Sequence, residues 1–298
     1  MADLASNIFK TALYFEGGSM RASYTAAAAV KFLEEGVYFD RVYGISAGAS
    51  NTVNYLSRDV FRTRASFTSF LDSPKVGSAA TWLRHKGLLS AHYIYQEAGQ
   101  VGGELPYDFA TFEANPADLC VIAVDRDTGR DLYFTKADMP TVDDLMVRVR
   151  ASSTLPALMP PPVIDGMSCY DGGFADGGGI PLRKIEADGY DRVVVLRTRP
   201  RGYRKADDNA WAKAFFARHP EMRDLTLTRS QRYNAACDEL EQWERDGRAY
   251  VFYADDMALG GAERDVTLLQ ASFDAGYAQV NREWRALMSY LDRSEGRR

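Results

Sequence analysis

Ser46 stands in the pentapeptide Gly44–Ile45–Ser46–Ala47–Gly48, which matches the pattern G-x-S-x-G. A serine on a sharp strand-to-helix turn has a strained backbone, and small residues on both sides relieve the crowding. The helix that follows such a turn offers free N–H groups and positive potential where negative charge develops. Glycines also serve ordinary tight turns, so a nucleophilic serine and a purely structural turn are both open at this point.

A glycine-rich segment, EGGSMRA, provides a second candidate site. Gly17, Gly18 and Ser19 follow directly after the apolar run Thr11–Phe15. Consecutive glycines allow close approach to the backbone, and their N–H groups can bind an anion. A nucleotide-phosphate loop is one alternative, but the segment fits neither G-x-G-x-x-G nor the G-K-[ST] ending of a P-loop. A transient oxyanion suits these amides better, and a glycine turn that packs a helix on a strand is the structural alternative.

Asp171 is followed by Gly172 and Gly173, which forms a third candidate site. An aspartate beside two glycines can approach another backbone closely, because no side chain intervenes. Taken alone, this sequence is an ordinary turn. Asp165, Asp171 and Asp176 could be considered metal ligands, but their spacing matches no calcium loop, and we predict no metal site.

The chain has three histidines, His85, His92 and His219, which limits the choice of a general base. Ser46, Asp171 and His219 have the chain order of an α/β-hydrolase triad. However, the nucleophile turn of that fold follows several strands, whereas Ser46 follows about two. His219 lies in a charged stretch outside the predicted sheet, and His85 and His92 flank an apolar helical segment. We therefore expect Asp171 to act as the base directly.

These residues must be positioned by alternating strands and helices. Short apolar runs predict strands at Thr11–Phe15, Arg41–Tyr43, Leu119–Asp125, Asp131–Thr135 and Val193–Arg197. Helical patterns cover Arg21–Glu35, Ala47–Leu56 and Val142–Arg150, with a mostly helical segment over Asp59–Gln100. The turn at Asp127–Gly129 predicts a hairpin between two of the strands. This alternation predicts a three-layer α/β/α domain over residues 1–200 with a mostly parallel central sheet.

The pattern changes after residue 200. Residues 201–298 are predicted as a mainly helical C-terminal extension packed on the first domain. Its predicted elements are a helix over Asp224–Asp246, a strand over Ala249–Ala254, and a helical pattern over Glu263–Asp292 with a turn at Gly276. Within this extension, Tyr233, Leu240 and Trp243 lie on one side of a helix, which indicates docking on the main domain; an oligomer contact is the alternative.

The segment Thr81–Gln96 mixes aromatic, aliphatic and cationic residues. This mixture is compatible with a lid or an acyl-chain groove near a membrane surface. A helix pair that covers the sheet is the interpretation we favour.

Composition excludes several other classes of protein. The 298 residues are 46% hydrophobic and 26% charged, with 36 Lys and Arg against 41 Asp and Glu, which is typical of a soluble globular protein. The net charge of -5 argues against a nucleic-acid-binding protein, because such proteins bind the phosphate backbone with clustered cations. The scattered cysteines, Cys120, Cys169 and Cys237, indicate a reducing compartment. The N-terminus has no basic region followed by a long apolar core, so we expect no signal peptide and a cytoplasmic location.

The ordered set EGGSMR, GISAG and DGG resembles the patatin-like phospholipase family, whose members use a Ser–Asp dyad on an α/β/α fold. The similarity covers about residues 11–200 and implies Ser46 as nucleophile and Asp171 as general base. It further implies an oxyanion hole formed by Gly17, Gly18 and Ser19, with supporting residues Arg21, Gly44, Gly48, Gly172 and Gly173. The extension is similar to that of a bacterial branch of the family.

Two positions depart from the family pattern. The family usually has a third glycine where Ser19 stands and a further glycine where Ala22 stands. Ser19 can still donate its N–H, provided that its backbone angles suit a residue with a side chain. Arg21 is expected to orient the glycine loop, and contact with a lipid phosphate is the alternative.

The resemblance implies an enzyme that cleaves carboxylic esters of lipids through an acyl-enzyme, as a phospholipase A, lysophospholipase or lipid acyl hydrolase. It implies no cofactor. Expected partners are the lipid ester and a transient membrane surface, and the sequence specifies no oligomeric state. One alternative is a weak or inactive protein that keeps the fold and binds lipid or acyl groups. Another alternative is an NAD-binding protein in which Asp40 would bind the ribose. The glycine-rich segment does not match the G-x-G-x-x-G pattern of such proteins, which disfavours this alternative.

Overall fold

The computed structural model describes residues 4–76, 90–156 and 158–295. An eight-stranded sheet runs through the centre of the molecule, in the order β5-β6-β3-β2-β1-β7-β8, with β4 paired to β3. The strands are β1 (Ala12–Phe15), β2 (Arg41–Ile45), β3 (Asp118–Asp125), β4 (Asp131–Phe134), β5 (Val163–Ile164), β6 (Met167–Asp171), β7 (Val193–Leu196) and β8 (Ala249–Phe252). The pairs from β3 through β2, β1 and β7 to β8 are parallel, and those that involve β4, β5 or β6 are antiparallel.

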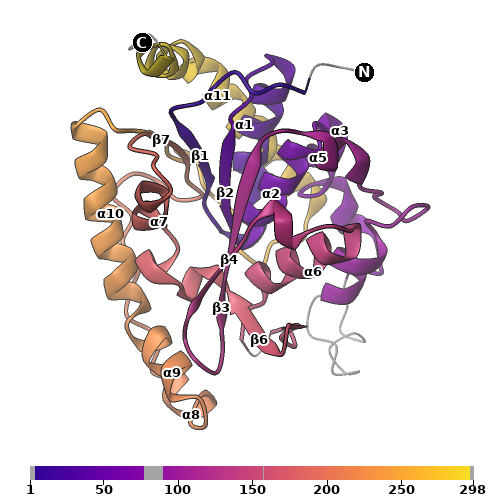
Figure 1. Ribbon diagram of the computed structural model, residues 1–298, viewed down its shortest axis with the longest axis vertical. Helices are drawn as coiled ribbons and strands as arrows, with labels where there is room; N and C mark the ends of the chain where they lie inside the picture. Colours follow the sequence, from indigo (N-terminus) through magenta and orange to yellow (C-terminus); the bar gives the residue numbers. More distant parts are fainter. Residues whose placement is uncertain (1–3, 77–89, 157, 296–298) are drawn as a thin grey trace.

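Helices cover both faces of this sheet (Figure 1). They are α1 (Ala22–Glu34), α2 (Ala47–Leu56), α3 (Val60–Ala65), α5 (Phe109–Ala114), α6 (Val142–Ser153), α7 (Leu182–Ala187), α8 (Ala212–Phe215), α9 (Pro220–Leu227), α10 (Arg229–Arg245) and α11 (Val266–Glu295). Short 3-10 turns span Ser19–Arg21, Ser69–Asp72, Lys136–Asp138, Gly172–Phe174 and Asp176–Gly178, and a π-helical turn spans Tyr93–Glu97. The three-layer α/β/α fold with a mostly parallel sheet is confirmed.

The alternation of side chains along the strands divides the core into two parts. On β1, Leu13 and Phe15 pack with α1, α2, α6 and α11, whereas Ala12 and Tyr14 pack with α7, α9 and α10. Successive residues of a strand point to opposite faces, so a strand buried on both faces is apolar throughout. This burial explains why the parallel strands appear in the sequence as short continuous apolar runs.

Two predicted elements differ from the structure: a single helix over Asp224–Asp246 and a turn at Gly276. Within the predicted helical segment 59–100, the described residues form α3, a 3-10 turn over Ser69–Asp72 and a π-helical turn over Tyr93–Glu97. Residues 77–89 lie outside the described residues, including most of the segment Thr81–Gln96. The predicted helix over Asp224–Asp246 is two helices, α9 and α10, which meet at Thr228.

The predicted turn at Gly276 is wrong, because α11 continues through this residue. A Cβ at Gly276 would lie 2.4 Å from the carbonyl oxygen of Tyr24 on α1. The glycine therefore permits close packing of α11 on α1 rather than ending the helix.

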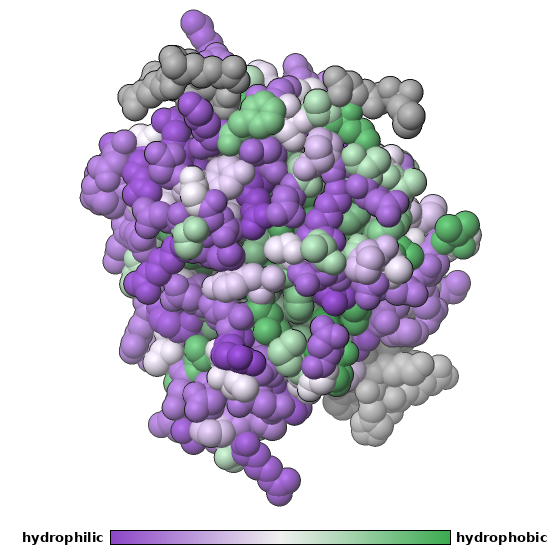
Figure 2. Space-filling view, viewed as in Figure 1, coloured by the Kyte–Doolittle hydropathy of each residue, from purple (hydrophilic) through white to green (hydrophobic). Residues whose placement is uncertain are grey.

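The C-terminal residues are integrated into the sheet. β8 pairs in parallel with β7 from Val193↔Ala249 to Leu196↔Phe252. On α10, Tyr233, Leu240 and Trp243 are buried in the same hydrophobic cluster as residues of the sheet. Hydrophilic residues cover most of the molecular face shown in Figure 2, and no helix among the described residues has the length and apolar character to cross a membrane.

Candidate active site

Ser46 lies at the junction of β2 and α2, with φ 58° and ψ -131°. This conformation is strained for a residue with a side chain, and it turns the chain sharply from the strand into the helix. The Ser46 N–H donates to Oγ of Ser152 at 2.9 Å, and that hydroxyl donates to the Ile122 carbonyl oxygen at 2.6 Å. Neighbouring strand and helix groups thus hold the turn in place.

Glycines on both sides of Ser46 allow the turn to pack tightly. Gly44 is buried near the end of β2, and Gly48 lies in the first turn of α2. A Cβ at Gly48 would lie 2.1 Å from the carbonyl oxygen of Phe15, at the end of β1. A side chain at this position would push the serine turn away from the glycine loop that follows β1.

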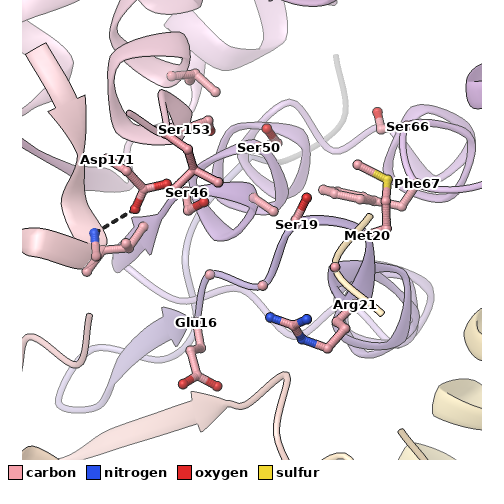
Figure 3. A pocket seen from close by; sticks show the side chains of 18 of the residues that line it. Glu16, Ser19, Met20, Arg21, Ser46, Ser50, Ser66, Phe67, Ser153 and Asp171 are labelled. Carbon is pink, nitrogen blue, oxygen red and sulfur yellow. Dashed lines mark hydrogen bonds between the residues drawn. The ribbon is translucent and has the colours of Figure 1, made fainter. Parts of the chain in front are cut away.

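Asp171 is the last residue of β6 and lies beside Ser46, as Figure 3 shows. Its Oδ1 accepts a hydrogen bond of 2.7 Å from the N–H of Gly173, which follows with Gly172 in a 3-10 turn. In the described part of the chain, its buried Oδ2 has no hydrogen-bond partner of standard geometry. One oxygen is therefore held by the backbone, while the other is an available acceptor.

Burial is the main influence on the Asp171 carboxyl, and it raises its pKa above the ordinary value. The positive charge of Arg229 and interaction with the Ser46 hydroxyl act in the opposite direction and lower this pKa, as does the Gly173 N–H. Burial dominates, so the group is a stronger base than an exposed aspartate.

The glycine loop faces Ser46 from the end of β1. A Cβ at Gly17 would lie 2.8 Å from Cβ of Ser46, so the loop backbone is in direct contact with the serine. Among the described residues, the N–H groups of Gly17, Gly18 and Ser19 have no hydrogen-bond acceptor. Ser19 adopts a φ of 52°, which favours glycine but keeps its N–H available. These amides can stabilise negative charge beside Ser46.

Sequence comparison assigns this arrangement to a family. The model of the family described as patatin-like phospholipase matches residues 13–183, which is more than half of the chain. The chain belongs to the patatin-like phospholipase family. At the level of this family it is a lipid acyl hydrolase that acts on lipid substrates.

Further comparisons cover the C-terminal residues and the whole of this patatin-like chain. A domain of unknown function, DUF6363, matches residues 219–292. No curated protein sequence matches the chain. A crystal structure of VipD from Legionella pneumophila is similar over 96% of this chain and 67% of that chain, with 12% identity and a TM-score of 0.49.

Ser46 and Asp171 line a cavity of about 750 Å³ in this patatin-like chain. One part of its wall is apolar and comes from segments near α2, α3 and α6: Val53, Phe67, Phe70, Leu71, Met146 and Val149. Another part carries Arg21, Arg199, Lys205 and Arg229. The cavity is thus suited to an amphipathic molecule, with the serine in its wall.

The described histidines lie outside this cavity. Nδ1 of His219 is 2.9 Å from Oδ1 of Asp127, and Nε2 of His92 is 3.3 Å from Oε1 of Glu97. His85 lies outside the described residues. Among the described residues, no cluster of three or more His, Cys, Asp or Glu side chains could hold a metal ion, so Asp165, Asp171 and Asp176 form no such site.

Glu16 is a site residue that sequence reasoning missed. It is buried just before Gly17, and it forms an ion pair of 3.2 Å with Arg197. It accepts hydrogen bonds from the Thr198 N–H at 2.8 Å and the Tyr233 hydroxyl at 2.6 Å. Together these bonds attach the glycine loop to β7 and to α10. The sequence feature that could have indicated this role is the position of Glu16, a carboxylate directly after an apolar strand.

Arg229, the first residue of α10, is the second residue that was missed. Its Nε donates to the Gly173 carbonyl oxygen at 2.7 Å, and its charge is the largest influence that lowers the pKa of Asp171. Nothing local in the sequence indicates this contact. Arg21, by contrast, was expected near the loop, and its guanidinium packs against Gly261.

Proposed function

We propose that Ser46 and Asp171 form a catalytic dyad that cleaves carboxylic esters of lipids, in the manner of a phospholipase A or lysophospholipase. One observation supports this most strongly: the buried carboxyl of Asp171 lies beside the Ser46 hydroxyl in the wall of an amphipathic cavity (Figure 3). We further propose residues 1–200 as the catalytic domain and residues 201–298 as an extension packed on it. A cytoplasmic location and contact with a membrane surface remain predictions from the sequence.

Acylation begins when Oγ of Ser46 attacks the ester carbonyl carbon and Asp171 accepts the hydroxyl proton. The carbonyl oxygen becomes an oxyanion, which accepts hydrogen bonds from the amides of Gly17, Gly18 and Ser19. Collapse of this intermediate breaks the bond to the alcohol oxygen. Asp171 returns its proton to the leaving alcohol, and the acyl group stays on Ser46.

Deacylation repeats these steps with water. Asp171 accepts a proton from the attacking water, and the acyl–Ser46 bond breaks. The proton returns to Oγ of Ser46, and the fatty acid leaves. A carboxylate of ordinary pKa is a poor base for an alcohol, so the burial that raises the pKa of Asp171 favours both steps.

Labelling with a fluorophosphonate probe tests the nucleophile. We expect covalent labelling of the natural protein and its loss in Ser46→Ala. Ser50→Ala is the matched control, since Ser50 lies on the same helix and lines the same cavity. Labelling of Ser46→Ala at the natural rate would exclude Ser46 as the nucleophile.

Hydrolysis of lipid esters tests the base. Asp171→Asn should lower kcat by at least about 10³-fold, a loss typical when a group of a catalytic unit is removed. Asp176→Asn, in the next turn of the same loop, should change kcat little. Absence of hydrolysis in the natural protein, together with retained lipid binding, would instead support the non-catalytic lipid-binding alternative.

A further inference from the structure

Four cationic side chains gather in one part of the cavity wall and define what we call the cationic cluster: Arg21, Arg199, Lys205 and Arg229. Arg21 lies near Arg199, and Lys205 lies near Arg21, Arg199 and Arg229 closely enough for their charges to influence each other's pKa. Figure 3 shows Arg21 with its guanidinium turned toward the glycine loop, away from Phe67.

The described part of the chain provides no ion pair for any member of this cluster. Nζ of Lys205 lies 4.2 Å from the centre of the Tyr233 ring, and the Arg199 guanidinium lies 4.1 Å from the centre of the Tyr203 ring. Neighbouring Arg197, by contrast, is paired with Glu16. Half-buried like charges repel one another, and burial with this repulsion lowers the pKa of Lys205 to about 8.

The acidic residues of the cavity make their hydrogen bonds with groups outside the cluster, apart from the influence of the Glu16 and Asp171 charges on the pKa values of Arg21, Lys205 and Arg229. Glu16 bonds to Arg197, Thr198 and Tyr233. Oε1 of Glu263 accepts the N–H groups of the next two residues, at 2.8 and 2.9 Å. Oδ1 of Asp171 accepts the Gly173 N–H, and its carboxyl interacts with the Ser46 hydroxyl. The cluster therefore has an excess of positive charge inside a cavity that a ligand can enter.

We propose that the cationic cluster binds the phosphate of an anionic lipid headgroup while the acyl ester lies at Ser46. The inference rests on the proposed function and names its substrate class: lipid esters with a phosphate that no cation in the same headgroup compensates. Arginine and lysine donors suit phosphate oxygens, and phosphate would supply the missing negative charge. The apolar wall on the α2, α3 and α6 side would hold the acyl chain.

The C-terminal extension contributes directly to this specificity. Lys205 and Arg229 both follow residue 200, and Arg229 lies within the matched domain of unknown function. The cationic cluster thus gives this extension a role in substrate selection besides its contact with the glycine loop.

The test compares three substrates that share the same acyl–glycerol ester: monooleoylglycerol, oleoyl lysophosphatidylcholine, whose choline cation compensates the phosphate, and oleoyl lysophosphatidic acid. In the natural protein, kcat/KM should be on the order of tenfold higher for lysophosphatidic acid than for the other two lipids, and added salt should reduce this preference. Lys205→Gln and Arg199→Gln should each reduce the preference by about fivefold. Lys213→Gln is the matched control because Lys213 is exposed on α8, and the preference should not change. A kcat/KM for lysophosphatidic acid no higher than that for lysophosphatidylcholine or monooleoylglycerol, or an unchanged preference in both variants, would overturn the proposal.

Binding to the Ser46→Ala protein separates this inference from the proposed function. Calorimetry should give a dissociation constant for oleoyl lysophosphatidic acid about tenfold below that for monooleoylglycerol, with the difference lost when Lys205→Gln is added. Selective binding to the variant, together with no hydrolysis of either lipid by the natural protein, would support the headgroup site and contradict the proposed function. Hydrolysis by the natural protein without selective binding would do the reverse. Inorganic phosphate is the third ligand, and if it binds as tightly as the phosphate lipid, the site holds the free anion and the headgroup assignment is wrong.

Discussion

The hydroxyl of Tyr233 donates a hydrogen bond of 2.6 Å to the carboxylate of Glu16, across 217 residues of the chain. Glu16 immediately precedes the glycine loop, and Tyr233 lies on α10 in the C-terminal extension. The C-terminal extension therefore contacts the base of the glycine loop, and this loop faces Ser46. Any change that loosens this bond should be detectable both in stability and in turnover.

Tyr233→Phe tests this contact. The hydroxyl donates to Glu16 and accepts from Arg197, and its loss should lower the free energy of unfolding by at least about 1.5–3 kcal/mol, measured by urea denaturation. It should also lower kcat, because the loop amides lose a support. Tyr203→Phe removes a hydroxyl that has no hydrogen bond to the described residues and should change stability by less than about 0.5 kcal/mol. Equal stability of both variants would contradict a stabilising role for the Glu16–Tyr233 bond.

The pH dependence of kcat/KM tests the charge of Arg229. Asp171 acts as a base only when ionised, and the positive charge of Arg229 lowers its pKa. In Arg229→Gln the pKa of Asp171 should rise, so the acid limb of the profile should move to higher pH. Arg229→Lys keeps a positive charge and should return the limb toward its natural position. A limb that stays in place in Arg229→Gln would mean that another group controls it.

Asp171→Asn should make the folded state more stable at neutral pH. Burial raises the pKa of Asp171, so ionisation costs more in the folded protein than in the unfolded chain. This cost is absent below the ordinary pKa of an aspartate and fully present above the raised value. The increase in the free energy of unfolding should therefore be seen at neutral pH and shrink in acid. Asp176→Asn is the control, and a destabilised Asp171→Asn at neutral pH would contradict the argument.

Ser19→Gly tests whether the departure from the family's glycine pattern weakens the site. Because Ser19 already has a φ of 52° and a free N–H among the described residues, glycine should keep turnover within about threefold. Ser19→Val should lower turnover more strongly, because a β-branched residue is strained at this φ. Steady-state kinetics on one lipid ester measures both. A rise in kcat of about 10²-fold in Ser19→Gly would show that the serine impairs the oxyanion hole.

Short-range sequence patterns are enough to predict the local elements and the residues proposed for chemistry. The strand before Gly17 and the helix after Ser46 follow from short-range patterns, and so does the hairpin β3–β4. Glycines that flank Ser46 and follow Asp171 mark turns, because turn geometry depends on neighbouring residues. These signals lie within a few residues of one another and need no knowledge of packing.

The distant residues that support this chemistry become apparent from the folded structure alone. The attachment of Glu16 to Arg197 and Tyr233, the contact of Arg229 with Gly173, and the pairing of β8 with β7 join segments far apart in the chain. Gly276 illustrates the same limit, because a glycine that breaks a helix and one that admits a neighbouring helix are identical in sequence. These contacts depend on which side chains pack together in the folded core. The helix and strand propensities of single residues do not specify those partners.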